Sequence, residues 1–247
     1  MLIAEVIDLN DVSDLRSYDD NLTLNYLDII SRGVPWTPPT ACHLLYHLVS
    51  TFHKPEVVEI ACCFGKATLY LAAAAKRQGG FVSCADIAEL SWEGRSAVEL
   101  LRQADLLGVC RIALGRDARW YLLDLLRQRQ GQWIDLAFID LTHTVEVDSF
   151  VALALWTHLR PGGILVFDDL DWVPAVNGIV DNRISEPTTK HVQVIFDYIS
   201  GLSDVAEKAE WGQEEVAWRW GFLRKRYDAE TDNVRLRDLL TGSRRLP

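Results

Sequence analysis

Acidic side chains follow apolar runs at several places in this chain, and one of them is joined by a histidine. Asp140 and His143 have the spacing D-x-x-H, and Asp168-Asp169 close the next apolar run. Carboxylates that meet at one edge of a sheet repel one another unless a cation joins them, and oxygen ligands select a hard ion such as Mg²⁺ or Mn²⁺. Histidine accepts a proton near neutral pH. Each feature taken alone also suits a polar turn, or a histidine that caps a helix or packs in a core.

A second group of residues fits a nucleotide-like ligand. The segment Val57–Thr68 runs from an apolar strand through small residues to Gly65 and then begins a helix, whose free N–H groups favour an anionic group. Asp86 closes the following apolar run, where a carboxylate accepts both hydroxyls of a ribose. Glu59 stands close to where a diphosphate would bind, which disfavours a diphosphate ligand. The same carboxylate suits the amino group of a sulfonium ligand such as S-adenosylmethionine.

Two other classes of nucleotide site fit less well. The glycine fingerprint G-x-G-x-x-G of a dinucleotide site is missing, so a pyrophosphate lacks its close backbone approach. A P-loop needs glycine where Ile60 stands, and serine or threonine where Ala67 stands. These substitutions disfavour a nicotinamide oxidoreductase and a nucleoside triphosphatase.

The elements that must position these residues alternate between strand and helix. Apolar runs predict buried strands, and the segments between them have helical periodicity. The predicted strands are Val57–Ala61, Phe81–Ala85, Arg111–Leu114, Ile134–Ile139 and Ile164–Phe167. The predicted helices are Ala67–Arg77, Glu93–Leu107, Ala118–Arg129 and Val147–Leu159, with Pro161-Gly162-Gly163 separating the last from its strand. This order predicts a doubly wound, Rossmann-like α/β sheet, mostly parallel, with helices on both faces and ligands at the strands' carboxyl ends.

Further elements flank this repeat. Two helices are expected before it, at Leu22–Ser31 and Thr40–Thr51, and a helix at Lys190–Ile199 is expected after it. Strands near Ala206–Trp211 and Val216–Arg224 predict an antiparallel edge hairpin. We therefore expect a helical lid or cap at 1–55, a ligand-binding domain at 56–226 and a charged tail at 227–247.

Composition limits the class of protein. The chain has 247 residues, of which 49% are hydrophobic, so it can bury a full core. The five cysteines include no C-x-x-C pair, which favours a reduced, cytoplasmic protein. The N-terminus does not read as a signal peptide, and no apolar stretch is long enough for a membrane span. A net charge of −10 argues against a nucleic-acid partner.

In this order and spacing, the motifs resemble those of class I S-adenosylmethionine-dependent methyltransferases, in particular the metal-dependent small-molecule O-methyltransferases of the macrocin, sugar and catechol kinds. Glu59–Ala72 (EIACCFGKATLYLA) is similar to their first motif, and Cys84–Ile87 (CADI) to their second. Arg116–Ala118 resembles the G-D-S segment whose acid lies beside the adenine. Phe138–Glu146 (FIDLTHTVE) and Leu159–Asp169 (LRPGGILVFDD) resemble the F-I-D-x-x-H-x-Y-E and L-x-P-G-G-x-x-V-x-D-D stretches.

The resemblance implies a cofactor site, a Mg²⁺ site and a catalytic pair. The residues that it places at the cofactor are Glu59, Ala61, Gly65, Thr68, Asp86, Ile87, Asp117, Ala118 and Asp140. It assigns Asp140, Asp168 and Asp169 as metal ligands and makes Asp140 and His143 catalytic. The chain departs from the family at Ala61, which replaces a glycine, and at Leu141 and Thr142, which replace a small or acidic pair.

The implied reaction is methyl transfer to a hydroxyl of a small molecule, such as a natural product, a sugar or a catechol-like ring. The metal would lower the pKa of the reacting hydroxyl, and His143, with an ordinary pKa of about 6.5, would take its proton. A metal-independent methyltransferase and a non-catalytic module that binds an adenosyl ligand remain alternatives.

The sequence setting of other histidines and of the tryptophans predicts where they lie. His43 and His47 lack nearby acids in the sequence and are expected on a helix surface or lid. Trp120 and Trp156 lie in helical patterns and are expected in the core. Trp92 and Trp172 in loops, like Trp36, suit stacking on adenine or on an acceptor, and Trp36 equally suits a homodimer interface.

Overall fold

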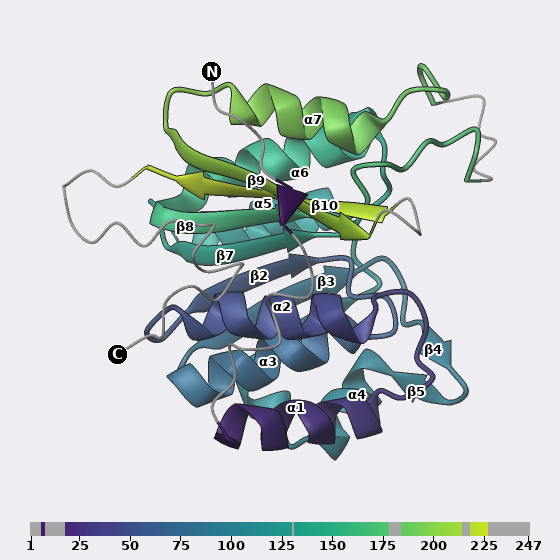
Figure 1. Ribbon diagram of the computed structural model, residues 1–247, viewed down its shortest axis with the longest axis vertical. Coiled ribbons are helices and arrows are strands. Elements are labelled where there is room, and N and C mark those ends of the chain that lie inside the picture. The colour runs from purple at the N-terminus through teal and green to yellow at the C-terminus, as the bar shows by residue number, and fades with distance from the viewer. Residues whose placement is uncertain (1–5, 8–17, 130, 178–183, 214–217, 227–247) are drawn as a thin grey trace. The chain divides into compact units, whose positions relative to one another are not determined.

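The computed structural model describes residues 6–7, 18–129, 131–177, 184–213 and 218–226, so the predicted tail at 227–247 lies outside the described residues. The described residues form two compact units (Figure 1). The N-terminal unit falls within residues 10–121, and the C-terminal unit falls within 122–237 and also takes in Val6 and Ile7.

The N-terminal unit is built on three parallel strands: β2 (Glu56–Ile60), β3 (Phe81–Asp86) and β6 (Cys110–Leu114). β3 pairs with both of the others, and Glu59 lies opposite Cys84 in the register. Helices α1 (Tyr18–Ile30), α2 (Pro39–Ser50), α3 (Lys66–Gln78) and α4 (Ala97–Gln103) complete the unit. α3 packs against α2, β2 and β3, and the small side chains of its alanine run let these elements approach closely.

The C-terminal unit combines parallel and antiparallel pairing. β7 (Ile134–Ile139) runs parallel to β8 (Leu159–Phe167), and β10 (Trp218–Lys225) pairs antiparallel with both β8 and β9 (Val205–Gln213). β1 (Val6–Ile7) extends this arrangement parallel to β9. Helix α6 (Val145–His158) packs on β7 and β8, and α7 (His191–Ser200) packs on α6 and β9. The division between the two units falls between Tyr121 and Leu122, within helix α5 (Ala118–Gln128).

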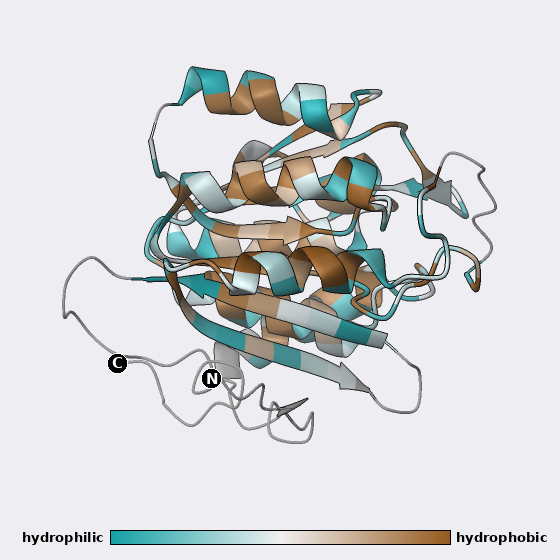
Figure 2. Ribbon diagram, turned by 90° about the horizontal axis from the view of Figure 1, so that it is seen from above, coloured by the Kyte–Doolittle hydropathy of each residue, from teal (hydrophilic) through white to brown (hydrophobic). Residues whose placement is uncertain are grey.

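The helices carry both hydrophilic and hydrophobic residues, as expected for elements with one face in a core (Figure 2). The predicted strand–helix order and the antiparallel edge hairpin are confirmed, and the fold is the expected doubly wound, Rossmann-like α/β class. No helix within the described residues is long and apolar enough to cross a membrane.

Two sequence-based predictions about elements are wrong. The helix expected at Glu93–Leu107 begins only at Ala97, because a small hairpin of β4 (Ser91–Trp92) and β5 (Arg95–Ser96) precedes it, turning at Gly94 with φ +78°. Pro161-Gly162-Gly163 does not separate α6 from its strand. It lies inside β8, whose register against β7 shifts between Ile134 and Leu136.

Candidate functional site

The loop between β2 and α3 is shaped by left-handed residues. Ala61, Cys63 and Gly65 have φ of +68°, +47° and +83°. A Cβ on Gly65 would lie 2.3 Å from the Cα of Ala97, so glycine is required there on steric grounds. The loop leads into the N-terminus of α3, where free N–H groups are available to a ligand.

Asp86 closes β3, as predicted, and is bound to this loop. Its Oδ2 accepts a hydrogen bond from the Cys63 N–H at 2.8 Å, and its Oδ1 accepts from the Ala88 N–H at 3.3 Å. Ile87 beside it is 73% exposed. The structure therefore presents a fixed carboxylate next to an open apolar side chain at the end of β3.

The other predicted cofactor residues of the N-terminal unit differ in setting. Glu59 and Thr68 are fully buried, Glu59 within β2 and Thr68 in the first turn of α3. Asp117 is bound by the Arg119 guanidinium at 2.7 and 3.0 Å, and this ion pair lowers the pKa of its carboxyl. Ala118 begins α5 directly after it.

Aromatic side chains lie at the loop after β2. Phe64 contacts Trp92 of the β4–β5 hairpin, with ring centroids 5.9 Å apart. The segment before α2 is fastened to the same region, because Lys66 Nζ donates to the Val34 carbonyl at 2.9 Å. Trp36 in that segment is 73% exposed. Trp36 lies in a loop, as expected, whereas Trp92, also expected in a loop, belongs to strand β4.

The burial of two further tryptophans and one histidine bears on their predicted locations. Trp156 is buried in the core, as predicted, but Trp120 is 66% exposed, so its assignment to the core is wrong. The assignment of His43 to a surface without acids is also wrong. His43 is buried, and its Nε2 lies 2.9 Å from Asp28 Oδ1, which also accepts from the Tyr70 hydroxyl.

The C-terminal unit brings the D-x-x-H motif and the second aspartate of the Asp168-Asp169 pair together. Asp140 directly follows β7, and Asp168-Asp169 directly follow β8, with the Asp168 N–H bound to the Ile139 carbonyl at 3.0 Å. His143 Nε2 lies 3.7 Å from Asp140 Oδ1 and 3.5 Å from Asp169 Oδ2. Strand ends of neighbouring parallel strands thus meet as the sequence predicts.

Trp172 lies against the histidine of this cluster. Its ring centroid is 4.7 Å from that of His143, at an angle of 45°. His143 has φ +56° and Asp169 has φ +53°, so both key side chains are carried by left-handed backbone that a non-glycine residue seldom adopts. Strain of this kind persists only where surrounding contacts hold it.

Burial and mutual repulsion shift the proton affinities of the cluster. The pKa of Asp168 is raised well above its ordinary value by burial and by the charges of Asp140 and Asp169. Burial raises the pKa of Asp169 to about 6 and lowers the pKa of His143 to about 4. His143 is therefore neutral at pH 7, and its pKa lies below the ordinary value of about 6.5 that was expected from the sequence.

Asp148, which sequence reasoning missed, holds the loop that carries His143. Its carboxylate accepts from the His143 N–H at 2.9 Å, from the Thr142 N–H at 3.3 Å and from the Thr142 hydroxyl at 2.7 Å. Burial raises the pKa of Asp148 to about 6. The sequence signal for this role is a short acid in the first turn of a predicted helix, since such residues bind the preceding loop.

The carboxylate oxygens of this cluster are of the ligand type that a hard divalent cation prefers. The charges of Asp140 and Asp169 add to burial in raising the pKa of Asp168. A bound cation would relieve this repulsion between carboxylates. Within the described ranges, no three acidic, histidine or cysteine side chains stand at metal-ligand spacing. A cation would therefore have to draw the carboxylates closer than they now lie.

The chain matches a protein-family model in sequence and known proteins in structure. Residues 58–170, from β2 to just beyond Asp169, match a family model described as a methyltransferase domain. No curated protein matches the chain in sequence. The O-methyltransferase TomG of Streptomyces achromogenes, in complex with S-adenosylmethionine, is similar in structure with a TM-score of 0.60 and 17% identity, over 86% of this chain and 92% of that one.

A second solved structure agrees. The O-methyltransferase of Bacillus cereus, in complex with S-adenosylhomocysteine, matches with a TM-score of 0.59 and 17% identity, over 88% of this chain and 95% of that one. At this identity the likeness shows the fold, which is that of the class I methyltransferases. The matched methyltransferase domain, residues 58–170 of the 247-residue chain, agrees with this fold.

Proposed function

We propose that the protein transfers the methyl group of S-adenosylmethionine to a hydroxyl oxygen of a small molecule. The observation that carries this proposal is the buried, neutral His143, whose Nε2 lies within 3.7 Å of both Asp140 and Asp169. A neutral imidazole has a nitrogen lone pair that can accept a proton, and carboxylates beside it offset part of the burial that lowers its pKa. The two structures compared above are O-methyltransferases in name, which agrees with this reaction class.

In this proposal the N-terminal unit binds the cofactor. Asp86, already fixed by the Cys63 N–H, accepts the ribose hydroxyls, and Ile87 offers its exposed apolar side chain to the adenine. Asp117 lies beside the adenine, and Glu59 binds the amino group. Ala61, Gly65 and Thr68 shape the turn from β2 into α3 around the ligand.

The C-terminal unit handles the proton. The hydroxyl proton of the acceptor passes to His143 Nε2 while the acceptor oxygen forms its bond to the methyl carbon. The bond from that carbon to sulfur breaks, its electron pair stays on sulfur, and S-adenosylhomocysteine is the product. Asp140 and Asp169, 3.7 and 3.5 Å away, offset part of the cost of charging the buried His143.

We further propose that Asp140, Asp168 and Asp169 hold Mg²⁺. The ion, when bound, supplies a lowered pKa for the acceptor hydroxyl. A metal-independent reaction is the second candidate, in which His143, placed between Asp140 and Asp169, takes the proton without the help of a metal ion. Loss of turnover on chelation, restored by added Mg²⁺, separates the two.

The acceptor that we propose is a hydroxylated small molecule, such as a natural product, a sugar or a catechol-like ring. TomG is described as acting in tomaymycin synthesis, which supports a natural-product acceptor by analogy alone. The strongly acidic composition supports a small-molecule partner over a nucleic acid.

Transfer of radiolabelled methyl from S-adenosylmethionine into a panel of catechols, phenolic natural products and sugars tests the proposal. His143→Ala is expected to lose roughly 10²–10⁴-fold in kcat while keeping its cofactor affinity, the usual loss for a general base. Unchanged turnover in this variant would exclude His143 as the base. Cofactor binding without turnover on any acceptor would favour the non-catalytic binding module.

A further inference from the structure

The first residue of α7 caps the N-terminus of α6. Val145 begins α6, so its N–H has no acceptor within the helix. His191 is buried, and its Nδ1 accepts a hydrogen bond from this N–H at 3.1 Å. Because Nδ1 accepts, the ring hydrogen is on Nε2, which donates it to the Glu186 carbonyl at 2.9 Å. Both ring nitrogens have partners, so the imidazole is fixed in place.

The turn of α6 that begins at Val145 also holds the loop of His143. The Asp148 carboxylate accepts hydrogen bonds from the N–H groups of Thr142 and His143, at 3.3 and 2.9 Å. Thr144 is the N-cap residue of α6, but among the described residues its side chain makes no capping hydrogen bond to the helix. The position of His143 therefore follows that of the first turn of α6, which is capped from α7.

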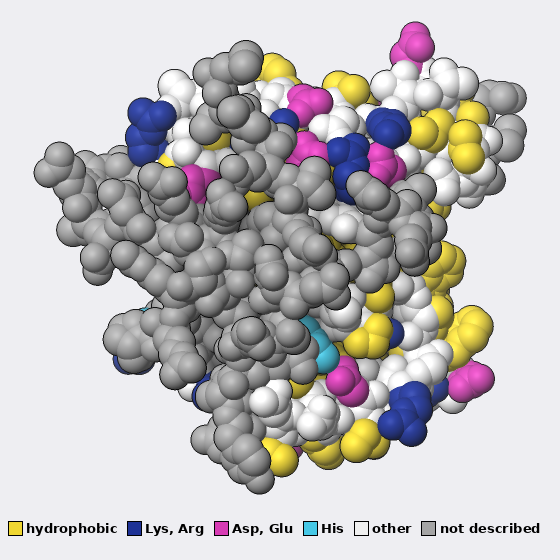
Figure 3. Space-filling model, viewed as in Figure 1, with side chains coloured by type: hydrophobic (Ala, Val, Ile, Leu, Met, Phe, Trp, Pro, Cys, Tyr) yellow, Lys and Arg dark blue, Asp and Glu magenta, His cyan; other side chains and the backbone are white. Residues whose placement is uncertain are grey.

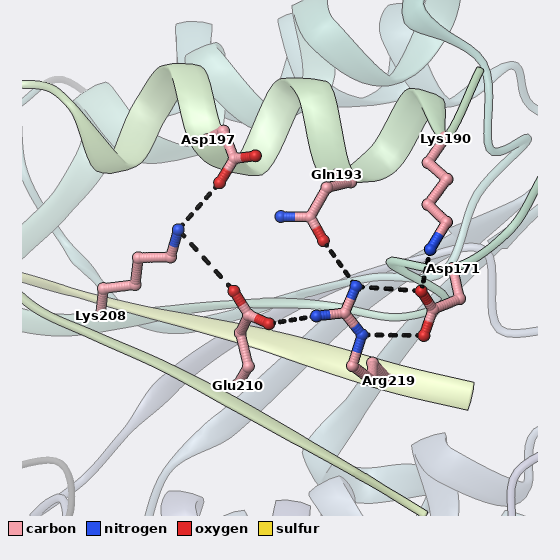
Figure 4. A network of polar contacts seen from close by, with 7 residues as sticks. All are labelled: Asp171, Lys190, Gln193, Asp197, Lys208, Glu210 and Arg219. Carbon is pink, nitrogen blue, oxygen red and sulfur yellow. Dashed lines mark hydrogen bonds and ion pairs between the residues drawn. The ribbon is translucent and has the colours of Figure 1, made fainter. Parts of the chain in front are cut away.

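Helix α7 is itself anchored by a network of charged and polar side chains. Lys190, the residue before His191, donates a hydrogen bond to Asp171 at 2.6 Å, and Gln193 accepts from the Arg219 guanidinium at 3.0 Å. Figure 4 shows these contacts and a further ion pair between α7 and β9. Acidic and basic side chains also lie together near α7 on the face seen in Figure 3. The start of α7 is thus a fixed point from which α6 is held.

We propose that His191 is a positioning residue that sets the place of His143 through the first turn of α6. This inference rests on the proposed function. A general base must stand within hydrogen-bond reach of the proton that it takes, and a displacement of about 1 Å costs up to about 100-fold in rate. Without an acceptor at Nδ1, the Val145 N–H loses its partner, and the turn that carries Asp148 is free to shift. A residue that only stabilised the fold would leave the place of His143 unchanged.

Two substitutions of equal size isolate the acceptor at Nδ1. In His191→Asn, the side-chain oxygen is bonded to Cγ, as Nδ1 is in histidine, so an acceptor for the Val145 N–H is kept. His191→Leu has the same branching and no acceptor, and both variants lose the bond to the Glu186 carbonyl. Methyl transfer is measured at saturating S-adenosylmethionine, and cofactor affinity by calorimetry. We expect kcat of His191→Leu to be roughly 10–100-fold below that of His191→Asn, with equal cofactor affinity.

The NMR signal of the His143 imidazole reports its place independently of turnover. The Trp172 ring, whose centroid is 4.7 Å from that of His143, shifts the signals of the imidazole C–H groups. We expect this shift to be kept in His191→Asn and reduced in His191→Leu. His158→Leu is the matched control, because His158 lies in the last turn of α6 and its Nδ1 bonds within that turn. It should match the wild type in kcat and in the His143 signal.

Equal kcat in His191→Asn and His191→Leu, in a protein whose wild type turns over, would overturn the inference and leave the proposed function standing. A wild type without turnover on any acceptor would end the proposed function. The NMR signal then decides alone: an unmoved His143 signal in His191→Leu overturns the inference, and a moved one supports it. If His191→Leu does not fold, His191→Gln, whose oxygen lies one bond further from the backbone, replaces it. No difference from His191→Asn would again overturn the inference.

Discussion

Asp148→Asn probes the buried acid that holds the loop of His143. In the folded protein, burial raises the pKa of Asp148 to about 6, whereas the unfolded chain has an ordinary value of about 3.9. The folded state therefore binds the proton more tightly, so this group stabilises the fold at low pH. That contribution is complete below the unfolded pKa and is lost as pH rises through about 6.

The size of the effect follows from the shift. About two pKa units correspond to roughly 3 kcal/mol in total, of which about 1.4 kcal/mol is lost between pH 5 and pH 8. Asparagine does not titrate, so the variant lacks this share of the pH dependence. At pH 8, asparagine avoids the burial of a charge, but it places a donor where the carboxylate now accepts from the His143 and Thr142 N–H groups.

Urea unfolding of the wild type and Asp148→Asn at pH 5 and pH 8 measures this difference. We expect the free energy of unfolding of the wild type to fall between pH 5 and pH 8 by about 1.4 kcal/mol more than that of the variant. Glu146→Gln, which changes an exposed acid of the same helical turn, is the control for an added amide. Parallel pH profiles for wild type and Asp148→Asn would refute the assignment of a raised pKa to this residue.

Three further results are expected. Gly65→Ala should lower the free energy of unfolding by roughly 2 kcal/mol or more, because its Cβ would meet Ala97. Gly108→Ala is the control, because a Cβ there has no heavy atom within 4 Å. Equal urea midpoints for the two variants would contradict this prediction. Arg219→Gln should cost roughly 1–3 kcal/mol by removing the contacts of its guanidinium with Asp171 and Glu210, although Lys190 and Lys208 still pair with these acids. The exposed Arg102→Gln should cost about 0.5 kcal/mol or less, and the same assay decides. Mn²⁺ at 100 times its dissociation constant should stabilise the wild type by about 2.7 kcal/mol, and an unchanged melting temperature would argue against a cation at Asp168.

The placement of the acids was predictable from sequence because strand ends are strong local signals. The apolar run Ile134–Ile139 matches β7 at both ends. Asp86 is the last residue of β3, Asp140 directly follows β7, and Asp168 directly follows β8. Continuous apolar runs predict buried strands well, since both faces must be covered. The cluster of Asp140, His143 and Asp169 follows from this order of elements.

Contacts that depend on distant pairing were not predictable. Nothing local to Trp218 indicates that it meets Asp168, 50 residues earlier, because that contact depends on the register of β10 against β8. The hairpin at Ser91–Ser96 also escaped prediction, since the helical pattern that follows it extends into its residues. Trp120 follows an apolar helical pattern and is exposed nonetheless, which a periodicity alone does not reveal.

Calorimetric titration with S-adenosylmethionine tests the central claim most directly, using Asp86→Ala beside the wild type. The carboxylate of Asp86 would make two charge-assisted hydrogen bonds to the ribose, each contributing about 1.5–3 kcal/mol, so the variant should bind at least about 100-fold more weakly. Micromolar binding by the wild type, lost in Asp86→Ala, is the predicted result. Absence of binding by the wild type, or equal affinity in the variant, would contradict the cofactor site described for β2, β3 and α3.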